Sequence, residues 1–111
     1  MNEVIRQLKE RKSVRVFTDQ AIPPEAVSAI LDSAVNAPTA GNQQLYTILN
    51  ITDQDMKDKL VKSCDNQPFI ATAPLVLVFC ADYRRWFEVF KTLELGEELR
   101  VPAEGDFMLA T

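Results

Sequence analysis

A run of cationic residues and a hydroxyl near the start of the chain, Arg11-Lys12-Ser13-Val14-Arg15, offers the clearest ligand chemistry in the sequence. Arginine presents planar donors that match phosphate oxygens, and serine adds a hydroxyl and a backbone N–H. If residues 13–15 are extended, Ser13 and Arg15 point to one side and Val14 to the other. Arg11 can join them from a preceding helix end. The run predicts a grip for one phosphate monoester; the alternative is a solvated basic run that compensates a helix dipole.

The residue types that are absent narrow the chemistry further. The 111 residues include no histidine, two cysteines and three glycines. Without histidine the chain has no Ser-His-Asp or Cys-His catalysis, and a zinc site is not expected. The glycines form neither a GxGxxG nor a GxxxxGK phosphate loop. Difficult chemistry would therefore come from a cofactor, with no catalytic side chain.

Composition indicates one soluble globular domain. Hydrophobic residues make up 47% and charged residues 25%, and the net charge of −4 argues against a general nucleic-acid or membrane-surface partner. No apolar run approaches the ~18 residues that a membrane span needs. No basic region leads into an apolar stretch at the N-terminus, so no secretory signal is expected. Cys64 and Cys80 are expected to be buried free thiols of a reducing compartment, which predicts a cytoplasmic protein.

Hydrophobic periodicity predicts the elements that position these residues. Proline and aspartate mark the starts of three helices, at Pro23-Pro24, Asp53 and Asp82. The expected order is a helix over 2–11, an extended segment or strand over 13–17, a helix from Pro24 that ends before Pro38, a strand over 45–51, a helix over 54–64, a strand over 75–81 and a helix from Tyr83.

Further expectations concern burial and connections. The apolar run 75–81 (LVLVFCA) predicts a strand buried on both faces. The helix over 54–64 is expected to turn four residues inward, and 70–74 to be a connector. Residues 94–106, rich in Glu and Gly, predict a mobile surface segment, and Gly105-Asp106 a further helix start. The four residues expected to point inward are Met56, Leu60, Val61 and Cys64.

The loop over 37–44 carries small and amide-bearing side chains that could hardly fill a core. Its hydroxyl, carboxamides and backbone groups suit hydrogen bonding to a flat polar ligand. A plain connector is the alternative, because most loops carry no site.

Taken together in chain order, these motifs resemble the nitroreductase-like family of flavin enzymes. Residues 11–17 (RKSVRVF) are similar to the RRSxRxF opening of that family, and residues 34–44 to its AxxAPSxxNxQ loop. Ile22-Pro23, Gln67, Ala73-Pro74 and Asp82 follow in family order. The departures are mild: Lys12 replaces a common Arg or His, and Thr39 a common Ser.

The resemblance implies a nitroreductase-like α+β fold, a mixed sheet flanked by helices, with residues 1–111 forming the truncated N-terminal part of a single FMN-binding domain. It implies an FMN-dependent oxidoreductase that passes electrons from NAD(P)H to nitroaromatics, quinones or similar acceptors in alternating half-reactions. It also implies a homodimer with the flavin at the interface. The implied cofactor-binding residues are Arg11, Lys12, Ser13 and Arg15 for the phosphate and ribityl end, Pro38, Thr39 and Asn42 for the ring, in part from the partner subunit, and Gln67 for the ribityl chain or ring edge.

A second hypothesis remains open beside the enzyme. The resemblance covers nearly the whole chain but only part of the family domain. The chain could therefore be a non-catalytic truncated or pseudoenzyme form that lacks tight flavin binding and acts, if at all, as a subunit partner.

Overall fold

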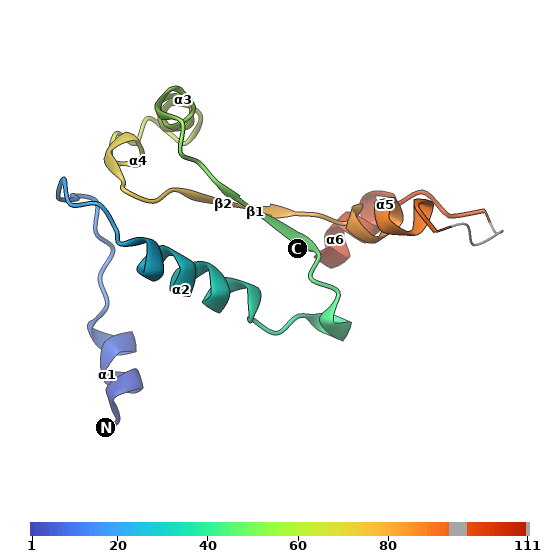
Figure 1. Cartoon of the computed structure of the whole chain (residues 1–111), viewed down its shortest axis with the longest axis horizontal. Coiled ribbons are helices and arrows are strands. Elements are labelled where there is room, and N and C mark those ends of the chain that lie inside the picture. Colours follow the sequence, from blue (N-terminus) through green and yellow to red (C-terminus); the bar gives the residue numbers. More distant parts are fainter. Residues whose placement is uncertain (94–97, 111) are drawn as a thin grey trace. The chain divides into compact units, whose positions relative to one another are not determined.

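The computed structural model describes residues 1–93 and 98–110, and Figure 1 labels its elements. The chain separates into two compact units: the first holds Met1–Ala21 and Asp53–Pro74, and the second Ile22–Thr52 and Leu75–Thr111. The first unit contains α1 (Glu3–Glu10), α3 (Gln54–Ser63) and α4 (Phe69–Thr72); the second contains α2 (Pro24–Val35), the 3-10 helix η1 (Ala40–Asn42), β1 (Tyr46–Asn50), β2 (Leu77–Ala81), α5 (Arg85–Lys91) and α6 (Glu104–Ala110). Helices with a small sheet give the α+β class that the sequence predicts.

In the first unit, α3 begins at the capping residue that the sequence predicts. The carboxylate of Asp53 accepts a hydrogen bond of 2.8 Å from the backbone N–H of Met56. Asn2 caps α1 in the same way, accepting from the N–H of Ile5 at 3.0 Å. Side-chain oxygens in these positions satisfy N–H groups that have no partner within the helix.

The α4 helix stands where the sequence predicted a connector. Pro68 precedes it with φ −62°, the value that proline fixes and that suits a helix start. Two side chains of α3 then bind the carbonyls at its end, Lys57 Nζ to Ala73 O at 3.0 Å and Gln54 Nε2 to Ala71 O at 3.2 Å. Contacts with α3 therefore stabilise α4, which is too short for hydrophobic periodicity to predict.

The segment over 13–17 forms no strand. Among the described residues it pairs with no β ladder, and the side chains of Val14 and Val16 are exposed. The strand alternative of the sequence prediction is therefore wrong, because a strand needs a neighbour for its backbone groups.

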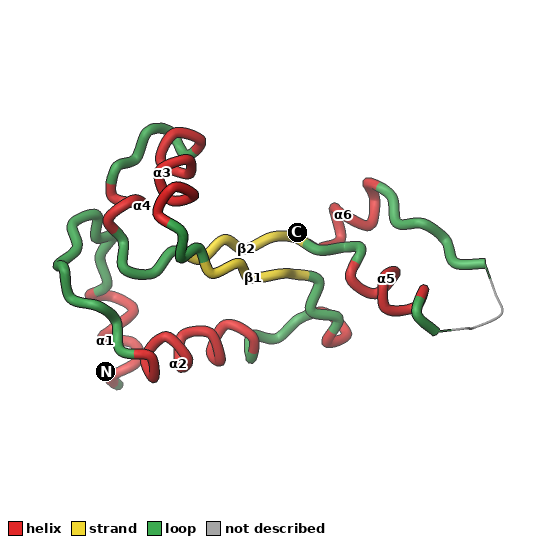
Figure 2. The backbone as a smooth tube through the Cα atoms, turned by 45° about the horizontal axis from the view of Figure 1, so that its top comes forward, coloured by secondary structure: helices red, strands yellow, loops and turns green. Residues whose placement is uncertain are grey.

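In the second unit, α2 begins at Pro24 and ends at Val35, as predicted. The two strands pair antiparallel, with Tyr46 opposite Ala81 and Asn50 opposite Leu77 (Figure 2). Hydrogen bonds extend the pairing at both ends, from Asp82 N to Leu45 O and from Ile51 N to Val76 O, each 2.9 Å. Because the strands run antiparallel, the loop before β1 and the turn after β2 meet at one end of the ladder.

The prediction that the apolar strand is buried on both faces is wrong for the described chain. Phe79 on β2 is 62% exposed and Leu49 on β1 is 45% exposed. A ladder of two strands leaves one edge of each strand unpaired, and its faces stay open unless other elements cover them. An apolar run shows that a strand could be buried on both faces. Whether it is buried depends on the elements that pack against those faces.

Asp82 does not cap the helix predicted from Tyr83, so that prediction is also wrong. The α5 helix begins three residues later, at Arg85, and the Asp82 carboxylate accepts a 2.7 Å hydrogen bond from Thr47 Oγ1. Thr47 lies opposite Cys80, so its side chain shares a face with Cys80 and with Asp82 two residues on. The Asp82 carboxylate thus binds the hydroxyl of Thr47 on the opposite strand instead of capping the helix.

Two residues expected to point inward from α3 are exposed. Leu60 and Val61 are half-buried as predicted, but Met56 is 43% exposed and Cys64 is exposed. Cys64 is the residue at which the helix ends, with φ −102° and ψ 52°, so it leaves the helical face. Both cysteines are free thiols, as predicted, but the prediction that both are buried is wrong, because Cys64 is exposed and Cys80 is half-buried.

Part of the predicted surface segment over 94–106 lies outside the described residues, namely 94–97. The described remainder runs irregularly over 98–103 and enters α6 at Glu104, close to the helix start that Gly105-Asp106 predicts. Asp106 accepts from the backbone N–H of Ala103 at 2.8 Å, which satisfies one donor at the helix start. No helix in the described part of the chain is long and apolar enough to cross a membrane.

The cap of α3 gives the first testable prediction. Asp53→Ala removes the acceptor of the Met56 N–H, and we expect it to lower the free energy of unfolding by about 1 kcal/mol. Urea unfolding followed by far-ultraviolet circular dichroism measures the change. Asp53→Asn is the control, since asparagine caps equally well; an equal loss in both variants would contradict the capping role.

Candidate functional site

The predicted site residues fall in both units of the chain, and each group is described within its own unit. The first unit carries the basic run and the amide, and the second carries the loop residues. They are Arg11, Lys12, Ser13, Arg15 and Gln67 in the first unit, and Pro38, Thr39 and Asn42 in the second.

The basic run begins where α1 ends. The N–H of Arg11 closes the last turn on Gln7 O at 3.0 Å, and its own backbone then turns away from the helix with ψ 146°. Within residues 1–93 and 98–110, the side chains of Arg11, Lys12 and Arg15 form no ion pair. Arg6 on α1 is the contrast, because Glu3 and Glu10 bind it at 2.6 and 2.7 Å. The cations of the run therefore remain available to an external anion.

Arg15 lies against the first residue of α4. Its guanidinium carbon is 5.9 Å from the centre of the Phe69 ring, a cation–π contact. Gln67 precedes Phe69 by two residues. The first unit thus brings one end of the basic run close to the turn that holds Gln67.

Gln67 is fixed by a tight turn after α3. Asp65 and Asn66 both have left-handed backbones, with φ 60° and 52°, which aspartate and asparagine tolerate better than most residues. The backbone N–H of Gln67 donates to Val61 O at 3.2 Å, and its side-chain Nε2 donates to Cys64 O at 3.0 Å. One of the two N–H donors of the side-chain amide is therefore used within the turn.

In the second unit, residues 38–44 form a closed and strained loop, named here the 38–44 loop. Gly41, Asn42 and Gln44 have left-handed backbones with φ 59°, 53° and 51°. The hydroxyl oxygen of Thr39 accepts from the N–H of Gln44 at 3.1 Å and closes the loop. Left-handed non-glycine residues cost about 1–3 kcal/mol each and persist where the surroundings fix them, often at functional sites.

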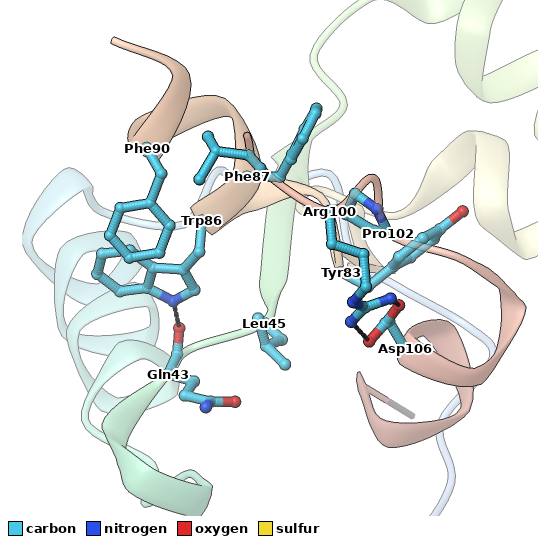
Figure 3. Close-up of a pocket in the computed structure, with 10 residues that line it drawn as sticks. Gln43, Leu45, Tyr83, Trp86, Phe87, Phe90, Arg100, Pro102 and Asp106 are labelled. Atoms are coloured by element: carbon cyan, nitrogen blue, oxygen red, sulfur yellow. Dashed lines mark hydrogen bonds and ion pairs between the residues drawn. The ribbon is translucent and has the colours of Figure 1, made fainter. Parts of the chain in front are cut away.

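Side chains from α5 hold this loop, and sequence reasoning missed them. The indole Nε1 of Trp86 donates to Gln43 O at 2.7 Å, as Figure 3 shows. Nη1 of Arg85 donates to Gln44 O and to Tyr46 O, both at 3.2 Å. No sequence pattern indicates these contacts, because they depend on the antiparallel pairing of β1 with β2, which brings the start of α5 beside the loop.

A cavity of about 550 Å³ opens beside the loop in the same unit. Aromatic side chains line much of it, and an ion pair stands at another part of its wall (Figure 3). Such a lining suits a flat, mainly apolar molecule. The aromatic residues are Tyr83, Trp86, Phe87 and Phe90, and the ion pair joins Arg100 and Asp106.

The ion pair is bidentate. Nη1 and Nη2 of Arg100 donate to the two carboxylate oxygens of Asp106 at 2.9 and 2.8 Å. The guanidinium, with help from the N–H of Ala103, lowers the pKa of Asp106 to about 2, and Asp106 in turn raises the pKa of Arg100. Both effects follow from hydrogen bonds that favour the charged forms.

Among the described residues, the first unit thus carries cations without carboxylate partners after α1, and the second unit carries a strained polar loop before β1. The model of the nitroreductase family matches residues 8–103. The chain belongs to the nitroreductase family, which confirms the resemblance seen in its sequence.

Relatives and solved structures agree with this assignment. The chain is 36% identical over 85 residues to an FMN reductase [NAD(P)H] of Bacillus subtilis, covering 77% of this chain and 34% of the relative. It is 30% identical over 96 residues to an oxygen-insensitive NADPH nitroreductase of Salmonella typhimurium, covering 86% and 40%. The structure of NfrA2 of B. megaterium matches with a TM-score of 0.85 and 33% identity, covering 99% of this chain and 44% of that one. The chain thus spans less than half the length of these proteins.

The ion pair at the cavity gives the second prediction. We expect the Asp106 carboxyl to titrate with a midpoint of about 2, and Arg100→Gln to raise that midpoint toward the ordinary 3.8. Because the folded pKa is depressed, the stabilisation is complete above the ordinary value and is lost as the pH falls through about 2. Carbon-13 NMR of the carboxyl measures the midpoint. Arg84→Gln is the control, since Arg84 pairs with Glu88 instead; an unshifted midpoint in Arg100→Gln would contradict the assignment.

Proposed function

We propose that residues 1–111 are the N-terminal part of a single FMN-binding domain in an oxidoreductase. The enzyme would pass electrons from NAD(P)H to nitroaromatics, quinones or similar small acceptors. Family membership and the names of the relatives support this reaction class. One observation carries the proposal: Arg11, Lys12 and Arg15 lack carboxylate partners within the described residues, and Arg15 lies at the α4 turn near Gln67.

The donors of the first unit fit the phosphate end of FMN. Arg11 and Arg15 offer forked donors, while Lys12 offers a point charge and Ser13 a hydroxyl. A phosphate monoester is the dianion that such a set binds best, because each hydrogen bond is charge-assisted. Gln67 would present its amide oxygen to the hydroxyls of the ribityl chain or to a donor at the ring edge.

The 38–44 loop fits the polar edge of a flat ring. Since the oxygen of Thr39 accepts from Gln44, the hydroxyl proton of Thr39 is left to donate outward. Asn42 adds a carboxamide, and Pro38 an apolar surface for the ring to rest on. These residues would approach the isoalloxazine, in part from the partner subunit.

The chain's own work would be to bind and orient the cofactor. FMN, when bound, would supply hydride and electron transfer in alternating half-reactions. Residues of the loop would donate to the ring and leave one face open to NAD(P)H and the acceptor. A chain without histidine suits this division, because no side chain has to act as nucleophile or general base.

The assembly proposed with this function is a cytoplasmic homodimer with the flavin at the interface. A net charge of −4 supports small-molecule substrates over nucleic acid or a membrane surface. Exposed Phe79 and Leu49 on the two strands support further protein packing against this sheet.

Those exposed strands, with the short span of the chain, also favour the second candidate, a non-catalytic chain that pairs with another subunit. Colour separates the two. In the presence of excess FMN and without a column step, a flavin absorption band that the protein shifts and that NADH or NADPH then bleaches supports the enzyme. A band that neither shifts nor bleaches supports the non-catalytic chain.

The phosphate grip gives the third prediction, tested with two ligands that differ only in the phosphate. Arg11→Ala and Arg15→Ala should each weaken FMN binding about 10- to 150-fold, the equivalent of 1.5–3 kcal/mol for a charge-assisted contact, and leave riboflavin binding unchanged. Flavin fluorescence titration measures both affinities. Arg6→Ala is the matched control, because this α1 arginine is already paired with Glu3 and Glu10. FMN affinity untouched by both changes would show that the cations do not meet the phosphate.

The fourth prediction concerns this chain by itself. Because it spans less than half the length of its relatives, we expect it to bind FMN weakly and to lose it on gel filtration. Absorbance of the protein peak before and after the column measures retention. Tight, stoichiometric FMN on the 111 residues would contradict this expectation.

A further inference from the structure

We propose that Arg85 and Trp86 are positioning residues that hold the 38–44 loop in the shape it offers to the flavin ring. This inference rests on the proposed function. It adds two residues of the second unit that lie about forty positions farther along the chain than the loop.

The loop needs an external hold. Three of its residues, Gly41, Asn42 and Gln44, occupy left-handed backbone conformations. Glycine and asparagine tolerate this region, whereas the side chain of Gln44 disfavours it. Its own bonds are few: Asn42 N to Thr39 O at 3.0 Å, Gln43 N to Ala40 O at 3.2 Å, and Gln44 N to the Thr39 hydroxyl. A short exposed loop with so few internal bonds samples other conformations unless neighbouring elements fix it.

The hold comes from the turn after β2 and the start of α5. Four successive carbonyls, of residues 43–46, accept hydrogen bonds from residues 82–86: Gln43 O from the Trp86 indole, Gln44 O and Tyr46 O from Arg85, and Leu45 O from the Asp82 backbone. The backbone bond merely continues the β ladder. The other three bonds depend on the identity of two side chains.

Neither side chain forms an ion pair with another described residue. Arg84, just before α5, and Lys91 on it pair with Glu88. Arg85 instead donates to Gln44 O in the loop and to Tyr46 O at the start of β1. The indole of Trp86 is steadied by the Phe90 ring one turn later, with ring centres 5.9 Å apart. Figure 3 shows the indole N–H directed at the Gln43 carbonyl, at the edge of the aromatic cavity.

The test uses variants that remove the hydrogen-bond donors of Trp86 and Arg85 and keep side chains of similar shape. Trp86→Phe keeps an aromatic ring and loses the N–H; Arg85→Gln loses the charged fork, and Arg85→Lys keeps a cationic donor. Arg84→Gln is the matched control, because Arg84 is next to Arg85 in the sequence but binds Glu88 and no loop carbonyl. Circular dichroism and urea unfolding verify that each variant remains folded.

The first readout is the loop itself, without flavin. We expect the amides of Asn42, Gln43 and Gln44 to exchange with solvent roughly 2- to 12-fold faster in Trp86→Phe, as for the loss of one hydrogen bond. The effect should be at least as large in Arg85→Gln, which loses two bonds from a charged donor. Arg85→Lys should recover part of the protection. Unchanged exchange in both variants would overturn the proposal.

The second readout separates the ring end of the ligand from its phosphate end. Both variants should weaken FMN and riboflavin by the same factor and shift the visible absorption band of the bound flavin. Faster amide exchange with unchanged riboflavin affinity would overturn the link to the ring. If the chain binds neither flavin, the proposed function fails. Amide exchange alone then tests whether Arg85 and Trp86 hold the loop.

Discussion

The antiparallel register of β1 and β2 is the constraint on which the second unit depends. Pairing of Tyr46 with Ala81 sets the residues before one strand beside those after the other. A slip of one residue would turn Thr47 away from Asp82 and move the start of α5 relative to the loop carbonyls. The ladder therefore fixes the strained loop, the aromatic cavity and the helix that borders both.

Charge is distributed differently in the two units. Around α5 and α6, opposite charges meet: Glu88 binds Arg84 and Lys91, and Asp106 binds Arg100. On α1 the same holds for Arg6. The cations of the run that follows α1 differ from these pairs, because they meet no carboxylate in the described part of the chain. An anionic ligand is the natural complement of such a run in a protein whose net charge is −4.

Aromatic and apolar side chains serve two purposes in this chain. Trp86 and Phe90 line a cavity and steady a hydrogen bond, so that their surface is partly used. Phe79 and Leu49 remain exposed on the strands, although the sequence around them has the apolar character of a core. Apolar side chains can thus line a cavity or stay exposed, depending on which elements pack against them.

The sequence by itself determined the elements and the family. Proline and aspartate signals placed the starts of α2 and α3, periodicity placed α1 and both strands, and the RKSVRVF run with the APTAGNQQ loop identified the fold and the proposed ligand. Local backbone and side-chain preferences carry these features, so they can be read from neighbours in the chain. Only the tertiary structure decided that Asp82 serves Thr47, that α4 forms beside α3, and that Arg85 and Trp86 reach the loop. Those outcomes join residues 16 to 43 positions apart, and such contacts depend on strand register and packing rather than on any local preference.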